Sequence, residues 1–319
     1  MPWIIGIDEA GYGPNLGPLV MTSVACRVPE ELADANLWRV LRTAVRRRAK
    51  ADDRRLFIED SKLVYSPARG LVDLETGVLA TLLPDGGAIS LTQFLDRLYG
   101  PRSPDHASEP WYSGSTLLPV AADPANLVVA ADRLVRSCQK KQLVWGLVRS
   151  EIVGPKRFNE LLDHWGSKGA VLGHALVELL RSNLRVDGES EPLLFIVDKH
   201  GGRNNYAAML QQAFCGGLVV AREEGASRSV YQVWGFDRKI QLTIEPRADG
   251  EYFCAALASM VSKYVRELLM LEFNRFWQTQ VPGLRPTAGY YGDAGRFYEE
   301  IRPAASKLGI PEQTIWRRR

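Results

Sequence analysis

Short apolar runs alternate with helical patterns along this chain of 319 residues. Runs of this kind, bounded by turn-forming residues, predict β-strands at Trp3 to Asp8, Leu19 to Val28, Leu143 to Val148, Leu193 to Asp198 and Leu218 to Ala221. Strands that alternate with helices indicate an α/β sheet protein rather than a helical bundle or a β-sandwich. Residues 66–136 differ, because Pro, Gly, Ser and Asp are dense there and only short helical pieces such as LTQFLDRLYG intervene. This composition predicts an inserted lobe with long loops.

The clearest helical pattern lies in EYFCAALASMVSKYVRELLM. Apolar residues recur there at intervals of three and four, which places them on one stripe of a helix: Phe253, Leu257, Met260, Val261, Tyr264, Leu268 and Leu271. Glu267 falls inside this stripe, whereas Arg266 is expected to point away from it. A carboxylate that faces inward needs a partner. Two partners remain open at this point, a salt bridge to Lys263 or a metal ion.

Composition indicates a globular protein of ordinary core size, with 46% apolar and 24% charged residues. No apolar stretch has the length of a membrane span and no signal segment precedes the first strand, so we expect a cytoplasmic protein. The four cysteines lie far apart without paired spacing, which excludes a zinc-knuckle pattern. The net charge of +3 is small, but basic residues gather in RTAVRRRAKADDRR and in the terminal RRR. Such segments are either solvated surface or a nucleic-acid footprint.

Acidic residues stand at the ends of two predicted strands. Asp8 and Glu9 follow the first apolar run and precede a glycine-rich stretch, and Asp198 closes LLFIVD before another glycine-containing loop. Each acid on its own is most simply a turn or cap residue. If the two strands are parallel neighbours, however, their carboxyl ends would bring the acids together at the edge where such sheets bind ligands. The glycine stretch lacks both a dinucleotide fingerprint and a phosphate-loop Lys-Ser/Thr pair.

A convergence of Asp8, Glu9, Asp198 and Glu267 would concentrate negative charge and require a counter-ion. Carboxylate oxygens favour Mg²⁺ or Mn²⁺ over zinc, and the four histidines show no metal-ligand spacing. Two such ions would activate a water and stabilise a leaving oxygen in phosphodiester cleavage. The sequence therefore predicts a divalent metal site at the strand ends.

Several motifs of the chain resemble those of the ribonuclease HII family, and they occur in the same order. GIDEAGYGPNLGPLV is similar to the opening DEAGRG signature, DSKLV to DSKKL, and FIVD to the strand that bears the third acid. AALASMVSKYVRELLM is similar to AAASIxAKVTRDxxM, GYYGD to KGYGT, and IWRRR to HRRSF. The match covers roughly residues 3–64, 140–200 and 240–319, and leaves 66–136 and the loop after Asp198 outside it.

The resemblance implies a ribonuclease H-like mixed β-sheet flanked by helices, with residues 1–319 as one catalytic domain, 66–136 as an insertion and 271–319 as a helical, substrate-contacting C-terminal region. It implies a monomeric, metal-dependent endoribonuclease that cleaves the RNA strand of RNA–DNA hybrids, or single ribonucleotides in duplex DNA, leaving 5′-phosphate and 3′-hydroxyl ends. The alternative is a non-catalytic nucleic-acid-binding relative.

By position, the resemblance assigns the metals to Asp8, Glu9, Asp198 and Glu267. Substrate contacts would come from Gly11, Tyr12, Gly13, Lys62, Ser259, Lys263, and either Tyr290 or Tyr291, of which Tyr291 fits slightly better. Backbone groups of the glycine stretch would face the ribose 2′-hydroxyl. The chain departs from the family pattern at Tyr12, where the family has Arg, and at Glu267, where it has Asp.

Overall fold

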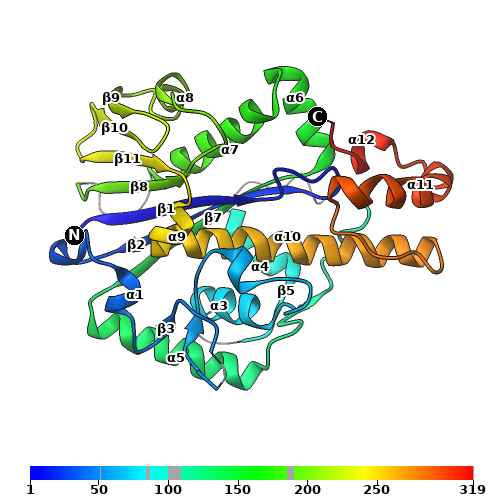
Figure 1. Ribbon diagram of the computed structural model, residues 1–319, viewed down its shortest axis with the longest axis horizontal. Helices are drawn as coiled ribbons and strands as arrows, with labels where there is room; N and C mark the ends of the chain where they lie inside the picture. Colours follow the sequence, from blue (N-terminus) through cyan, green and yellow to red (C-terminus); the bar gives the residue numbers. More distant parts are fainter. Residues whose placement is uncertain (51, 84–86, 100–108, 185–189, 319) are drawn as a thin grey trace.

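A mixed β-sheet forms the centre of the computed structural model, which describes residues 1–50, 52–83, 87–99, 109–184 and 190–318 (Figure 1). Within these residues the largest sheet has seven strands in the order β7-β2-β1-β8-β11-β10-β9. The strands are β1 (Trp3–Ala10), β2 (Leu19–Arg27), β7 (Val144–Val153), β8 (Leu193–Asp198), β9 (Leu218–Glu224), β10 (Ser229–Trp234) and β11 (Ile240–Glu245). All the predicted strands are confirmed, whereas β10 and β11 were missed by the sequence prediction.

The sheet topology brings the ends of three parallel strands to one edge. β1 pairs with β8 in parallel, with Ile7 opposite Val197, and β11 pairs with β8 in parallel, with Glu245 opposite Asp198. The first strand and LLFIVD are therefore parallel neighbours, which is the condition under which Asp8 and Asp198 were expected to meet. Because the carboxyl ends of β1, β8 and β11 coincide, the acids that follow them lie near one another.

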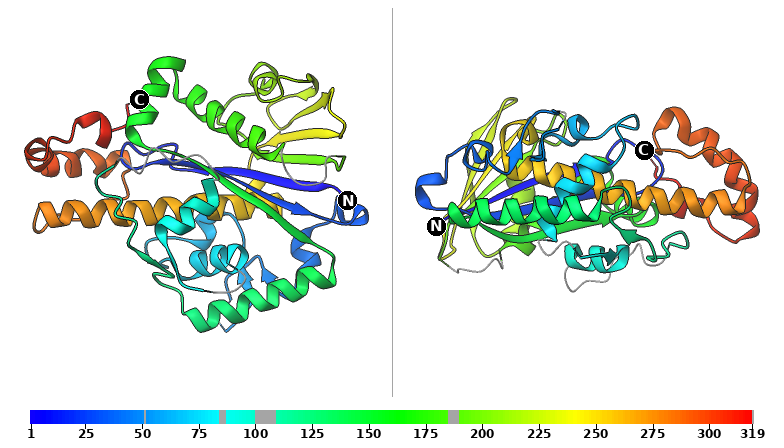
Figure 2. Two further views of the ribbon diagram at one scale, coloured as in Figure 1. Left: turned by 180° about the vertical axis from the view of Figure 1, so that it is seen from behind. Right: turned by 90° about the horizontal axis from the view of Figure 1, so that it is seen from below.

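Helices cover both faces of the sheet (Figures 1 and 2). One face packs on α7 (Lys168–Asn183) and α8 (Ala207–Ala213), with α6 (Pro155–Trp165) next to α7. The other face packs on α10 (Phe253–Gln280), behind which lie α3 (Val72–Leu82) and α5 (Pro124–Lys140). The remaining elements are short segments and the C-terminal helices: η1 (Glu30–Leu32), α1 (Leu37–Val40), β3 (Val45–Arg46), β4 (Leu56–Phe57), α2 (Ser61–Val64), β5 (Ile89–Ser90), α4 (Leu91–Tyr99), β6 (Leu117–Leu118), α9 (Ala248–Glu251), α11 (Tyr291–Lys307) and α12 (Glu312–Ile315).

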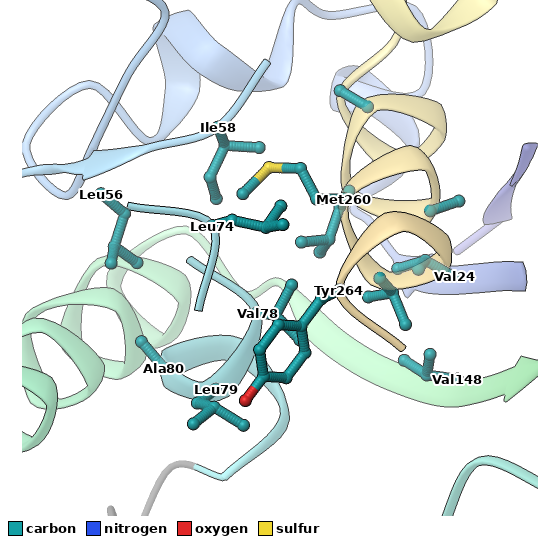
Figure 3. Packing of buried hydrophobic residues seen from close by; sticks show 14 of the residues in the cluster. Val24, Leu56, Ile58, Leu74, Val78, Leu79, Ala80, Val148, Met260 and Tyr264 are labelled. Carbon is teal, nitrogen blue, oxygen red and sulfur yellow. The ribbon is translucent and has the colours of Figure 1, made fainter. Parts of the chain in front are cut away.

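Close packing fixes α10 against β1. A Cβ atom on Gly6 would stand 2.1 Å from the backbone nitrogen of Ala255, so only glycine allows the strand and the helix to approach this closely. On the opposite side of the helix, Met260 and Tyr264 point into an apolar cluster with Leu74 and Val78 of α3 (Figure 3). The helix is thus buried between the sheet and α3, which sets its position relative to Asp8.

The described part of 66–136 is more helical than the sequence predicted. It holds α3, α4 and most of α5. Glu75 is fully buried and accepts hydrogen bonds from the backbone N–H of Val120 at 2.7 Å and from the Tyr264 hydroxyl at 2.6 Å. This carboxylate therefore joins two parts of the segment to α10.

Among the described residues, no helix is both long and apolar enough to cross a membrane.

Candidate functional site

Asp8, Glu9, Asp198 and Asp249 form an acidic cluster at the shared edge of β1, β8 and β11, in which Asp8 and Asp249 are buried and Glu9 and Asp198 are partly exposed. Asp8 and Glu9 belong to the end of β1, Asp198 is the last residue of β8, and Asp249 lies in α9 just after β11. Burial raises the pKa of Asp8 well above its ordinary value, and the charges of Glu9, Asp198 and Asp249 raise it further. Three of the four acids predicted from sequence are therefore brought together.

Two other members of the acidic cluster hold their protons up to neutral pH. Burial raises the pKa of Glu9 to about 7, with a further contribution from the charge of Asp198. Burial likewise raises the pKa of Asp249 to about 7, assisted by the charges of Asp60 and Asp198. The charged cluster is unfavourable unless a cation compensates it.

Backbone contacts hold the acids in place. The amide of Glu9 donates to Oδ1 of Asp8 at 2.7 Å, and the amide of Ala248 donates to Oδ1 of Asp198 at 2.9 Å. The hydroxyl of Ser262 donates to the backbone oxygen of Asp8 at 3.0 Å, which connects α10 directly to the end of β1. The acidic cluster is therefore positioned by strands and a helix rather than by exposed loops.

Asp249 was missed by the sequence prediction, although a signal for it exists. Ile240, Leu242 and Ile244 alternate with polar residues in IQLTIE and are buried, as expected for a strand with one face on the core. An acid that follows such a strand obeys the same rule that identified Asp8 and Asp198. Recognition of β11 would have indicated both Glu245, its last residue, and Asp249, four residues further along the chain.

The structure does not bring Glu267 to the acidic cluster, against the sequence prediction. Its Oε1 lies 2.5 Å from Nζ of Lys263, and its Oε2 accepts a hydrogen bond of 2.9 Å from the hydroxyl of Tyr65. Ser259 shares a hydrogen bond with Asp8, and Glu267 follows Ser259 by eight residues, which is about 12 Å along the helix. The salt bridge to Lys263 is therefore the observed arrangement.

Arg266 also differs from its predicted position. Its side chain is 1% exposed and donates hydrogen bonds to the backbone oxygens of Leu16 and Ala288. The helix is buried on this side as well, because the loop that follows β1 covers it. Arg266 thus supports the glycine stretch instead of facing solvent.

The donor set of the acidic cluster suits a hard divalent cation. Oε2 of Glu9 is buried and has no hydrogen-bond partner among the described residues, so it is an acceptor left free at the cluster. Carboxylate oxygens are the ligands that Mg²⁺ and Mn²⁺ prefer. As the side chains stand, no three His, Cys, Asp or Glu residues in the described ranges form a closed metal-binding group. Mutual repulsion disfavours close approach of carboxylates, and a bound cation would offset it.

Lys62 provides a positive charge beside the acidic cluster. Partial burial lowers the pKa of Lys62, but the charges of Asp60, Asp249, Asp8 and Asp198 outweigh burial and raise it. The residue follows Asp60, whose carboxylate caps α2 by accepting from the amide of Lys62 at 2.9 Å. Its predicted place near the substrate is thus compatible with its position in the structure.

The glycine stretch leaves backbone open beside the acidic cluster. Gly11 has φ +85°, a conformation that favours glycine, and a Cβ atom there would stand 2.5 Å from the backbone oxygen of Pro18. Gly13 is exposed, and a Cβ atom there would meet nothing within 4 Å. The backbone around Gly13 is therefore accessible to a ligand.

Residues of the C-terminal segment hold the glycine stretch in place through hydrogen bonds. Arg317 is fully buried and donates from Nη2 to the backbone oxygens of Gly11 and Pro14. Its amide donates to the oxygen of Asn15 at 2.8 Å, and the amide of Asn15 donates to the oxygen of Gly289 at 2.9 Å. Tyr290, which follows Gly289, is 51% exposed and lies under the guanidinium of Arg266 at 5.7 Å. The terminal basic residues thus shape the loop.

The other predicted substrate residues occupy different surroundings. Ser259 is buried and donates to the hydroxyl of Ser61 at 3.0 Å, so it joins α10 to α2. Tyr12 is partly buried against the apolar cluster on the face of the sheet that packs on α7 and α8. The charges of Glu9 and Arg203 act on its hydroxyl group. Tyr291 is 68% exposed at the start of α11. Of the two tyrosines, Tyr290 is the one attached to the glycine stretch.

Comparisons with known proteins were made by sequence and by structure. No protein-family model and no curated protein matches the chain. Among solved structures, it is similar to RNase HII in the PCNA:RNase HII complex from Archaeoglobus fulgidus, at 15% identity over 99% of this chain and 94% of the other, with a TM-score of 0.44. Ribonuclease H2 from Pyrococcus horikoshii OT3 shows 15% identity over 98% and 92%, with a TM-score of 0.44. Bst-RNase HIII in complex with Mn²⁺ shows 13% identity over 99% and 66%, with a TM-score of 0.40.

Proposed function

We propose that this protein is a metal-dependent endoribonuclease that hydrolyses the RNA strand of RNA–DNA hybrids, or single ribonucleotides within duplex DNA, and leaves 5′-phosphate and 3′-hydroxyl ends. One observation carries the proposal: four acids from three separate elements meet at one edge of the sheet, where burial and the charges of neighbouring acids raise the pKa values of Asp8, Glu9 and Asp249. A structural role would not require such an arrangement, because it lowers the stability of the cation-free fold.

Asp8, Glu9, Asp198 and Asp249 would hold Mg²⁺ or Mn²⁺. A divalent cation bound there supplies Lewis-acid activation of water and stabilisation of the charge on a phosphodiester. The chain itself contributes orientation, since β1 and β8 carry three of the four acids and the amide of Ala248 fixes one oxygen of Asp198. Lys62 contributes a fixed positive charge at the side of the acidic cluster.

Recognition of a ribonucleotide is assigned to the glycine stretch. The exposed backbone around Gly13 can approach a sugar because no side chain covers it. The 2′-hydroxyl is both a donor and an acceptor, and it is the group that distinguishes RNA from DNA. Tyr290 presents an exposed ring beside this stretch, where it would stack on a sugar or base.

The alternative is a nucleic-acid-binding protein without turnover. The acidic cluster favours the enzyme, because negative charge repels a phosphate backbone and would weaken a protein that only binds. Divalent cations reverse this repulsion and allow hydrolysis at the same place. Neutralisation of the acidic cluster should therefore abolish cleavage by an enzyme, whereas it should not weaken nucleic-acid binding by a protein that only binds.

The test is cleavage of a duplex with one ribonucleotide, beside a continuous RNA–DNA hybrid and an all-DNA duplex, with Mg²⁺ and with Mn²⁺. We expect cuts only where a ribonucleotide is present, and loss of cutting in Asp8→Asn with duplex binding retained. Glu267→Gln serves as a matched control, because it removes a carboxylate outside the acidic cluster and should keep most of the activity. Binding without cleavage under all conditions would support the alternative function.

A further inference from the structure

A cavity of about 580 Å³ borders the acidic cluster, and no residue of the glycine stretch lines it. Its lining includes Asp198 and Asp249 of the cluster together with the basic residues Arg47, Arg48, Lys62 and Arg247. The glycine stretch contacts Arg266, which is about 20 Å along the helix from Phe253, where α10 begins. The acidic cluster is therefore flanked by two separate surfaces.

The basic sequence RTAVRRRAKADDRR separates into bound and free arginines in the structure. Arg47 pairs with Glu59 at 2.5 Å, donates to the backbone oxygen of Gly250, and lies over the ring of Trp38 at 4.3 Å. Arg46 donates to the backbone oxygen of Arg48 at 2.6 Å. These contacts fix the backbone at residue 48 against α9.

Arg48 and Arg247 are the free cations of this cavity. Both side chains are exposed, and neither has an ion pair or a side-chain hydrogen bond among the described residues. Lys62, by contrast, is surrounded by carboxylates whose charges act on it. Arg48 and Arg247 are therefore available to a ligand.

The backbone of Arg247 adopts a strained conformation beside the cavity. Its φ is 61°, in the left-handed region that glycine or asparagine adopts at lower cost. The next amide, that of Ala248, donates to Oδ1 of Asp198 at 2.9 Å. The turn places the guanidinium at the cavity while its backbone holds an acid of the cluster, and strain of this kind gathers at functional sites.

The charge balance of the cavity changes when a metal binds. Its lining includes four acids, Glu59, Asp60, Asp198 and Asp249, and four cations, Arg47, Arg48, Lys62 and Arg247. Glu59 and Arg47 neutralise each other as a pair. Once a divalent cation compensates Asp198 and Asp249, the positive charge of the two free arginines is in excess and attracts an anion.

We propose that Arg48 and Arg247 bind a backbone phosphate of the nucleic-acid strand that crosses the acidic cluster, on the side away from the glycine stretch. The proposal rests on the proposed nuclease function, since that function supplies the strand. Arginine suits this role, because its planar fork matches the oxygens of a phosphate. The strand would thus be held on both sides of the acids, by open backbone on one side and by two arginines on the other.

The test measures binding rather than cleavage. In the Asp8→Asn background, the affinity for a fluorescent duplex with one ribonucleotide is followed over a salt series for Arg48→Gln, Arg247→Asn and the double variant. Asparagine is chosen at 247 because it tolerates positive φ. Arg42→Gln is the matched control, because Arg42 is an exposed arginine of the same segment that does not line the cavity.

We expect each cavity variant to lower the slope of log affinity against log salt by about 0.9, the double variant by about twice that, and the control to leave it unchanged. Arg48→Lys should restore the slope because it restores the charge. Thermal unfolding should show that all variants are folded. Equal losses in the control and the cavity variants, or no loss in any of them, would overturn the proposal while the nuclease function stood. Failure of the Asp8→Asn protein to bind any duplex would overturn both.

Discussion

Replacement of Glu9 by glutamine is expected to stabilise the cation-free protein at alkaline pH. Glu9 has an ordinary pKa of 4.5 in the unfolded chain and a pKa of about 7 in the fold, where burial and Asp198 disfavour its charge. Below pH 4.5 the side chain is protonated in both states and contributes no penalty. As the pH rises from 4.5 to 7, the unfolded chain releases its proton first, so the free energy of unfolding falls; above pH 7 the penalty is complete.

The size of the effect follows from the difference of 2.5 pH units between these two values. At about 1.4 kcal/mol per unit, the upper limit is about 3 kcal/mol. Glu9 is partly exposed, and solvent screening reduces the penalty to roughly 2–3 kcal/mol. Glutamine keeps the shape of the side chain and has no charge, so it should recover this amount at pH 8 and almost none at pH 4.5.

The assay is equilibrium urea unfolding in the presence of a chelator, followed by tryptophan fluorescence at several pH values between 4.5 and 8.5. Glu160→Gln is the control, because Glu160 is exposed and lies outside the acidic cluster. Addition of Mn²⁺ at pH 8 should then stabilise the natural protein more than Glu9→Gln, since ligand binding to the folded state raises the free energy of unfolding. A difference between the natural protein and Glu9→Gln that stays constant with pH would refute the reasoning.

Three further outcomes are expected. Asp249→Asn should lower metal-dependent cleavage by roughly 100-fold or more, whereas Glu267→Gln should retain most of it; the reverse order in a cleavage assay would restore the sequence-based assignment. Glu75→Gln should lower the free energy of unfolding by about 2–3 kcal/mol in urea, because the amide cannot accept from all the donors that the buried carboxylate serves. Tyr12→Arg should steepen the salt dependence of hybrid binding by about one unit of slope and leave the preference for a ribonucleotide unchanged; a preference that appears only in the variant would contradict reading by the backbone.

Local sequence was enough to predict five of the strands and the acidic residues at the ends of two of them. Apolar runs predicted β1, β2, β7, β8 and β9, because burial of a strand leaves a signature in consecutive residues. The acids at the ends of β1 and β8 were identified by the rule that parallel strands end at a common edge. That rule needs only the strand, the turn and the acid, all of which are adjacent along the chain.

The composition of the acidic cluster was decided by tertiary structure. Glu267 lies within an apolar stripe as the pattern predicted, but Lys263 and Tyr65 satisfy its carboxylate, and Tyr65 comes from a segment about 200 residues away. Asp249 joins the cluster because β11 pairs with β8, a contact that no local pattern specifies. The same reason separates Arg48 from Arg47 within one basic run: which arginine is paired depends on Glu59 and Gly250, which reach it only through the fold. Local sequence thus determined which acidic and basic residues lie at the ends of strands and helices. Tertiary structure determined which of these residues are neighbours, because the energy of a charged side chain depends on groups that are distant along the chain.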